Sequence, residues 1–227
     1  MDSPDQGAKG IPTGKTEYAD SVLTITAPAL GMKFSGKWQG TDRIQGTFVQ
    51  GGLTLPLALA RVDGEVALSR PQEPKPPYPY RVEEVTFENT KAGVTLAGTL
   101  TLPEKGEHYP VVVLISGSGP QNRDEELMAH KPFLVLADYL TRQGIGVLRF
   151  DDRGVGQSTG NFGTATTLDF AGDVEAAVNF LKNDRKIRNI GLIGHSEGGM
   201  IAPLVASRSG DVAFIVLLAG PGLRGDR

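Results

Sequence analysis

Residues 190–206 read IGLIGHSEGGMIAPLVA, and this stretch decides the fold of the second half of the chain. A short apolar run at residues 190–193 leads directly into a G-x-S-x-G pattern centred on Ser196, and a second apolar run follows it. The pattern is typical of a sharp strand-to-helix turn, in which the glycines allow close backbone approach and the serine hydroxyl points outward. The sequence therefore predicts Ser196 as a nucleophile.

A second match to the same pattern surrounds Ser158. Ser158 lies in a polar loop at residues 153–167, with no strand leading directly into it and no helix starting after it. A nucleophile on such a turn needs both, so the context favours Ser196 over Ser158.

Strands and helices alternate through the second half of the chain. Pro132 and Gly144 mark the two ends of one helix, and Thr166 with Asp169 offers a capping box for the next. This alternation predicts an α/β fold with a mostly parallel, doubly wound sheet. The expected strands are residues 81–88, 94–102, 111–116, 146–151, 190–195 and 214–218, and the expected helices are residues 130–143, 168–183 and 199–207.

The first 70 residues follow a different pattern, in which apolar and polar residues alternate. Alternation of this kind is typical of antiparallel strands with one buried face, and it extends to the leucines at positions 53, 55, 57 and 59. We expect a small antiparallel β-meander or partial barrel whose further N-terminal strands are absent from this chain. Its four strands are expected at residues 22–26, 33–38, 44–49 and 53–61.

The chain is therefore expected to contain two domains. Residues 1–70 form the β domain, which serves either as a packing or dimerisation element, the favoured interpretation, or as a binding module. Residues 71–79 contain five prolines and predict an extended linker. The second domain covers residues 80–227.

The composition excludes several classes of function. The 23 Lys and Arg residues are balanced by 26 Asp and Glu residues, so no broad basic face is available for nucleic acid or an anionic membrane. The chain has no cysteine, three histidines and no glycine motif for phosphates or dinucleotides, so we expect no metal and no cofactor. Residues 1–7 lack the features of a signal peptide, and the apolar runs are too short to span a membrane, so we expect a soluble protein.

Three landmarks occur in order in the second half: SGSGP at residues 116–120, FDDRGVGQS at residues 150–158, and the turn at Ser196. Together they resemble α/β-hydrolases over residues 81–222. The combination of SGSGP with GHSEGG is similar to bacterial serine esterases and acyl hydrolases, some of which carry an N-terminal β domain that resembles a lipocalin.

The resemblance implies a small acyl-ester substrate and an acyl-Ser196 intermediate. In such enzymes two backbone N–H groups hold the oxyanion, one from the residue after the nucleophile and one from the loop after the third strand. Here these residues would be Glu197 and Ser118. Gly119 is the alternative to Ser118, because a glycine-rich loop does not fix its own register.

Two neighbouring features are expected to be structural. The adjacent carboxylates of Asp151 and Asp152 point in different directions, and Arg153 can pair with either of them. The His195 ring is expected to point away from the Ser196 hydroxyl and to pack or hydrogen-bond locally.

No histidine follows Ser196, although α/β-hydrolases place the acid and the histidine after the nucleophile. His108 lies at the opposite end of the expected sheet, and His130 is out of chain order. Among the acids, Asp211 lies at the wrong end of the sheet, while Asp226 is an alternative that lacks its histidine. The sheet is therefore expected to be incomplete, with the base and the acid supplied by association with a missing C-terminal segment or fragment. A homodimer is a further option.

Three functions stay open from the sequence. The favoured one is hydrolysis of carboxylic esters through Ser196. A peptidase or amidase of the prolyl oligopeptidase type uses the same catalytic groups, and a non-catalytic binding protein or inactive fragment would explain the absent histidine.

Overall fold

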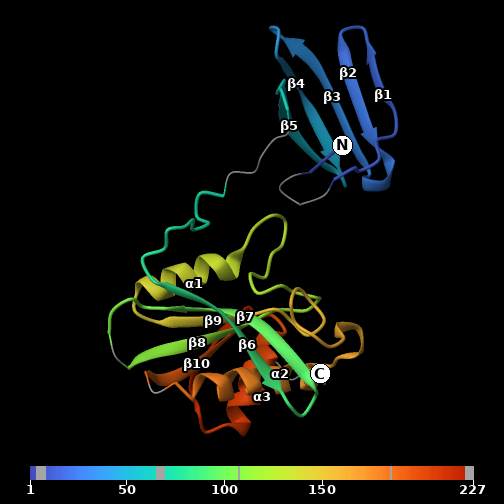
Figure 1. Cartoon of the computed structure of the whole chain (residues 1–227). Helices are drawn as coiled ribbons and strands as arrows, with labels where there is room; N and C mark the ends of the chain where they lie inside the picture. Colours follow the sequence, from blue (N-terminus) through green and yellow to red (C-terminus); the bar gives the residue numbers. More distant parts are fainter. Residues whose placement is uncertain (4–8, 65–69, 107, 185, 223–227) are drawn as a thin grey trace. The chain divides into compact units, whose positions relative to one another are not determined.

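The structure is a computed structural model that describes residues 1–3, 9–64, 70–106, 108–184 and 186–222. The chain divides into two units, Met1–Ser69 and Arg70–Arg227, shown in Figure 1. Each unit has its own sheet, so each is described by itself.

The first unit is an open antiparallel meander of five strands in the order β1-β2-β3-β4-β5. Its small core contains Met32, Phe34 and Ile44, which alternate with exposed residues along their strands. A β-meander was expected, and the structure adds a strand before it. The strands are β1 (Thr16–Ala19), β2 (Val22–Ala27), β3 (Met32–Gln39), β4 (Arg43–Gln50) and β5 (Leu53–Ala60), with a 3-10 turn η2 at Pro28–Leu30.

One expectation for this unit is wrong. Leu53, Leu55 and Leu57 lie on β5 as the alternation indicates, but they are 55%, 46% and 37% exposed. Strand β5 is an edge of the sheet, and within the described residues no second layer covers these leucines. The alternating pattern therefore identified the strand but did not show what covers its apolar face.

The second unit contains a mixed six-stranded sheet in the order β11-β10-β8-β9-β7-β6. Four neighbouring strands, β11, β10, β8 and β9, are parallel to one another. The β6-β7 hairpin adds two antiparallel strands beside β9, at one edge of the sheet. The elements are β6 (Arg81–Asn89), β7 (Val94–Leu102), β8 (Tyr109–Ile115), α1 (Pro132–Arg142), β9 (Gly146–Phe150), η3 (Phe162–Thr164), α2 (Thr167–Leu181), β10 (Ile187–His195), α3 (Gly198–Arg208) and β11 (Val212–Leu218).

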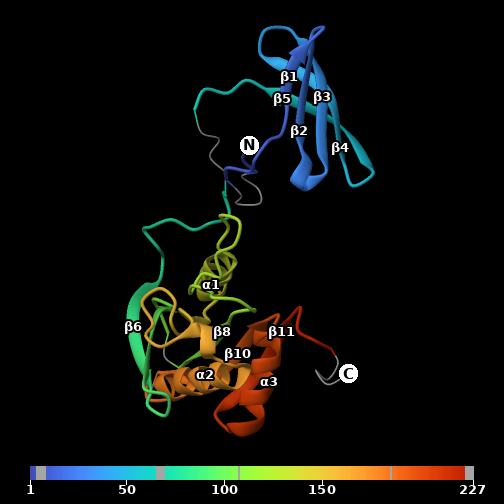
Figure 2. The ribbon, with the colours of Figure 1, turned by 90° about the vertical axis from the view of Figure 1, so that its right-hand side faces the viewer.

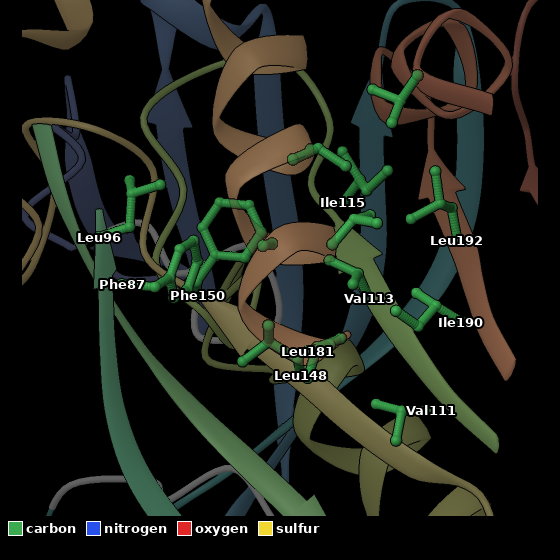
Figure 3. Packing of buried hydrophobic residues seen from close by; sticks show 14 of the residues in the cluster. Phe87, Leu96, Val111, Val113, Ile115, Leu148, Phe150, Leu181, Ile190 and Leu192 are labelled. Atoms are coloured by element: carbon green, nitrogen blue, oxygen red, sulfur yellow. The ribbon is translucent and has the colours of Figure 1, made fainter. Parts of the chain in front are cut away.

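The sheet is covered on both faces, with α1 on one side and α2 and α3 on the other (Figure 2). Alternate residues of the central strand β8 pack on the two faces of the sheet. Val111, Val113 and Ile115 belong to the cluster under α2 and α3 (Figure 3), whereas Val112 and Leu114 pack toward α1. This two-sided burial explains why the parallel strands read as continuous apolar runs.

The helix ends confirm the expected capping residues. Pro132 opens α1, and Gly144 follows its end with φ +88°. At the start of α2 the Asp169 carboxylate accepts hydrogen bonds from the Thr166 backbone N–H (2.8 Å) and hydroxyl (2.7 Å). The first helix starts two residues later than predicted, because the backbone of His130 is engaged in a turn with Leu127.

The proline-rich segment 71–79 belongs to the second unit. It forms no helix or strand, as expected, but it is not a free spacer. The Glu73 carboxylate accepts a hydrogen bond from the Lys131 backbone N–H (3.1 Å), just before α1, and the neighbouring Tyr80 hydroxyl donates to Asp138 within α1 (2.8 Å).

Strand β11 is an edge strand with exposed apolar side chains, as the sequence indicates. Its residues Phe214 to Leu218 are each between 37% and 45% exposed. Such an edge has unpaired backbone groups that can pair with another strand. Among the described helices, none is long and apolar enough to cross a membrane.

Candidate active site

The predicted turn at Ser196 joins the end of β10 directly to the start of α3. Ser196 has φ +50°, a left-handed conformation that costs a residue with a side chain about 1–3 kcal/mol. Its backbone N–H donates to the Leu218 carbonyl (2.9 Å), and its carbonyl accepts from the Gly199 N–H (2.9 Å). The residue is partly exposed, and its hydroxyl makes no hydrogen bond to any described residue. The Ser196 hydroxyl is therefore not engaged by any described residue.

The two glycines of the pattern are required by close backbone approach. A Cβ on Gly194 would collide with the Gly198 carbonyl, which lies across the turn. A Cβ on Gly198 would collide with the carbonyl of Ile115 at the end of β8. The turn can be this tight only when Gly194 lacks a side chain, and it can lie this close to the central strand only when Gly198 lacks one.

The loop after β8 lies against the serine. A Cβ built on Gly117 would be 3.1 Å from the Cβ of Ser196. The N–H of Gly117 is occupied, because it donates to the Glu125 carboxylate at 2.7 Å. The N–H groups of Ser118 and Gly119, and that of Glu197 on the other side, make no hydrogen bond to a described residue. These are the three residues that the sequence analysis names for the oxyanion.

Glu125 is a site residue that the sequence analysis missed. It is 6% exposed, and its Oε1 atom accepts both the Gly117 N–H and a hydrogen bond from His195 Nδ1 at 2.7 Å. A local interaction was expected for His195, and this expectation is wrong, because its hydrogen bond joins residues 70 positions apart. No sequence signal identifies Glu125, since it lies in an irregular loop without periodicity.

The segment Asp151-Asp152-Arg153 has a structural role, but its pairing differs from the expectation. Arg153 pairs with Asp173 of α2, with a distance of 2.7 Å between Nε and Oδ2. Asp151 is held instead by the guanidinium of Arg123 at 2.8 Å. Neither interaction joins neighbours in sequence, so adjacency did not predict the partners.

Asp152 supports the glycine-rich loop at both ends. Its carboxylate accepts hydrogen bonds from the Ser116 hydroxyl (2.8 Å) and from the Gln121 backbone N–H (2.9 Å). Burial raises the pKa of Asp152 to about 6, and the nearby carboxylates of Asp173 and Asp151 contribute in the same direction. The loop therefore depends on a carboxylate that is costly to ionise.

The alternative nucleophile, Ser158, is buried and fully engaged. Its hydroxyl donates to the Asp151 carbonyl (2.7 Å) and accepts from the Ala97 N–H (3.0 Å). Ser158 therefore joins the loop after β9 to strand β7, and its hydroxyl is not available for attack.

No described histidine hydrogen-bonds Ser196. His108 directly precedes β8, at the end of the sheet opposite the turn, and His130 Nδ1 lies 3.6 Å from a Glu73 oxygen. Asp211 also lies at the opposite end and pairs with Lys182 at 3.0 Å. Asp226 lies outside the described residues. The described part of the site thus combines an unengaged serine hydroxyl with free amides but places no histidine at the serine.

A small cavity of about 20 Å³ lies beside this loop, between the sheet and α2. Its lining includes Gly117, Gly119, Asp152, Phe170 and Glu197. The volume is sufficient for about one water molecule. Among the described residues, no three His, Asp or Glu side chains are grouped as metal ligands.

Comparison with known proteins agrees with this geometry. Residues 130–227 match the family described as serine aminopeptidase, S33. Esterase EstD of Thermotoga maritima is 32% identical over 144 residues, which cover 63% of this chain and 35% of EstD.

Solved structures show the same fold. The esterase Pf2001 of Pyrococcus furiosus superposes with a TM-score of 0.52 and 25% identity over 63% of this chain and 51% of its own. The α/β-hydrolase GrgF of Penicillium sp. sh18 superposes with a TM-score of 0.54 and 24% identity over 62% of this chain and 46% of its own. The matched region thus spans about a third of EstD and about half of these structures. The unit Arg70–Arg227 contains part of the α/β-hydrolase fold, and its sequence is similar to that of esterases.

Proposed function

We propose that this chain provides the nucleophile and the oxyanion-binding amides of a serine esterase that hydrolyses carboxylic esters. The observation that carries the proposal is the turn at Ser196. Its backbone has φ +50°, and its hydroxyl has no hydrogen-bond partner among the described residues. The N–H groups of Glu197, Ser118 and Gly119 likewise have no partner among the described residues. The esterases among its relatives support the same reaction class.

In the proposed reaction, Ser196 Oγ attacks the ester carbonyl carbon while a general base takes the hydroxyl proton. The carbonyl oxygen becomes an oxyanion and accepts hydrogen bonds from the N–H groups of Glu197 and Ser118, with Gly119 as the alternative to Ser118. Each such donor is worth about 3 kcal/mol in the transition state. The intermediate then expels the alcohol, which takes the proton, and water releases the acid from acyl-Ser196.

We propose that the base and its acid come from a polypeptide segment outside these 227 residues, which pairs with β11. The exposed apolar edge of β11 supports this arrangement, and so does the absence of a base at Ser196 among the described residues. The new strand would lie next to the turn, because the Leu218 carbonyl already accepts the Ser196 N–H. A second copy of the chain is the other partner that this edge allows.

Labelling with a fluorophosphonate probe tests the proposal, since the probe reacts with an activated serine hydroxyl. The native protein, purified with any chain that accompanies it, should be labelled, and Ser196→Ala should abolish the labelling. Ser207→Ala is the matched control, because Ser207 lies exposed at the end of the same helix and only bonds its own turn. Equal labelling of the Ser196→Ala protein, or none of the native protein, would overturn the proposal.

A peptidase activity is the second candidate, because the matched family is described as a serine aminopeptidase. The same nucleophile and amides serve both reactions, so only the leaving group discriminates between them. Turnover of an ester and an amide with the same acyl part decides the question. If p-nitrophenyl acetate turnover stays at background in the intact native protein, the non-catalytic alternative holds.

A further inference from the structure

We infer that Glu125 is a positioning residue that holds the oxyanion loop and the nucleophile turn in register. The inference rests on the proposed function, because it concerns how the two halves of that site are kept together. A single oxygen, Oε1, accepts one hydrogen bond from each half: 2.7 Å from the Gly117 N–H and 2.7 Å from His195 Nδ1.

The first partner, Gly117, determines which amides stay free. Three consecutive N–H groups, at positions 117, 118 and 119, lie in a loop rich in glycine whose residue Gly117 approaches Ser196. Glu125 occupies the first of them, so only Ser118 and Gly119 are left for an oxyanion. A loop with two glycines has several accessible conformations, and a fixed acceptor on one N–H selects among them.

The second partner, His195, connects this acceptor to the nucleophile. His195 directly precedes Ser196, and an ionised carboxylate only accepts, so Nδ1 carries the proton in this hydrogen bond. The Glu125 oxygen is therefore joined by one hydrogen bond to the Gly117 backbone and by another to the side chain of the residue before Ser196. A displacement of about 1 Å between such segments costs catalysis as much as 100-fold.

Glu125 is itself held by a rigid support. Its φ is +49°, and its backbone N–H donates to the Asn122 carbonyl at 2.9 Å. The Arg123 side chain and N–H bond the buried Asp151 carboxylate, which ties the same loop to the end of β9. Glu125 is 6% exposed, and these contacts restrict how far its carboxylate can move with the oxyanion loop.

The burial of the Glu125 carboxylate also needs an explanation, because this carboxylate makes no contact with Ser196. Removing such a group from water is unfavourable unless hydrogen bonds replace those to the solvent. The two bonds of Glu125 provide that replacement, and both go to the segments that build the site. This distribution of partners is what a positioning role requires.

Steady-state ester hydrolysis by the native protein, compared between variants, tests the inference. Glu125→Ala removes both hydrogen bonds, so kcat should fall about 10- to 100-fold while KM changes less than threefold. Glu125→Gln keeps an amide oxygen at Oε1 and should recover most of the lost rate. Glu126→Gln is the matched control on the same loop, because Glu126 is exposed and lies outside the site, and its kcat should stay unchanged.

A second measurement separates a positioning role from a general effect on folding. The amide exchange of Gly117, followed by NMR, should be slow in the wild type and in Glu125→Gln but fast in Glu125→Ala, while exchange in the core of β8 stays slow in all three. If Ser196 of the wild type is not labelled by the fluorophosphonate, the proposed function fails. If it is labelled and Glu125→Ala keeps its kcat, only the positioning role is refuted.

Discussion

Replacing Asp152 by asparagine should change the pH dependence of stability in a defined window. The pKa of the folded carboxyl is about 6, against 3.8 for the ordinary value, chiefly because of burial. A pKa raised on folding means that the folded state binds the proton more tightly than the unfolded state. Ionisation therefore destabilises the fold: the cost is absent below pH 3.8, grows between pH 3.8 and 6, and is complete above pH 6.

The magnitude follows from the two pKa values. The difference between 3.8 and about 6 corresponds to about 3 kcal/mol at 25 °C. Asparagine carries no charge, so the free energy of unfolding of Asp152→Asn does not fall by this amount as the pH rises. Asparagine can keep both hydrogen bonds, with Oδ1 accepting from the Gln121 N–H and Nδ2 donating to the Ser116 hydroxyl, and its effect on them is the same at every pH.

Urea denaturation at pH values from 4 to 7.5, followed by circular dichroism at 222 nm, measures the effect. All described α-helices lie in the second unit, so this signal reports on the unit that contains Asp152. The free energy of unfolding of Asp152→Asn relative to wild type should rise by about 2 kcal/mol between pH 4 and pH 7.5, because part of the loss already occurs below pH 4. Ser207→Ala is the control, since Ser207 bonds only its own helical turn and makes no hydrogen bond to Asp152, and its profile should stay parallel to that of the wild type. Parallel profiles for Asp152→Asn would refute the reasoning.

Two further predictions concern the turn and the sheet edge. Gly198→Ala should destabilise the second unit by about 1–3 kcal/mol in the same urea assay, because the new Cβ meets the Ile115 carbonyl. Gly210→Ala, with open space around the new Cβ, is the control and should be neutral or slightly stabilising. Equal effects of the two substitutions would contradict the close approach of Gly198 to Ile115. Val216→Lys in the exposed β11 should weaken association with the pairing segment or second copy by tenfold or more, measured by sedimentation velocity, and unchanged association would show that β11 is not the pairing edge.

The parts of this fold that were predicted from sequence depend on short-range patterns. The turn at Ser196 is such a case, because the residues that require glycine lie within the turn or at the end of one adjacent strand. The strands and helices of the second unit were predicted in the right order, since each carries its own period and its own end signals. Strand β1 was missed because all four of its residues are exposed, so it has no apolar alternation.

The errors arise where the outcome depends on partners distant in sequence. Arg153 was expected to pair with its neighbours, yet its partner is Asp173, 20 residues away on α2. Glu125 gives no sequence signal, because its role depends on a loop that returns to residues 117 and 195. Burial of the β5 leucines was inferred from alternation, but alternation specifies only that two faces differ and not that either is covered.

Strand β11 links the assembly of the sheet to the reactivity of the serine. The strained backbone of Ser196 is held on one side by β8, whose Ile115 carbonyl lies against Gly198, and on the other by the hydrogen bond from Ser196 N–H to Leu218. Leu218 is the last residue of an edge strand, and edge strands open more readily than central ones because only one neighbour holds them. A strand added beside β11 would therefore stabilise the turn as well as bring further residues to the site. On this reasoning, Val216→Lys should lower the rate of fluorophosphonate labelling in proportion to the association that it removes. A variant that dissociates and keeps the full labelling rate would separate the two effects and show that β8 alone maintains the turn.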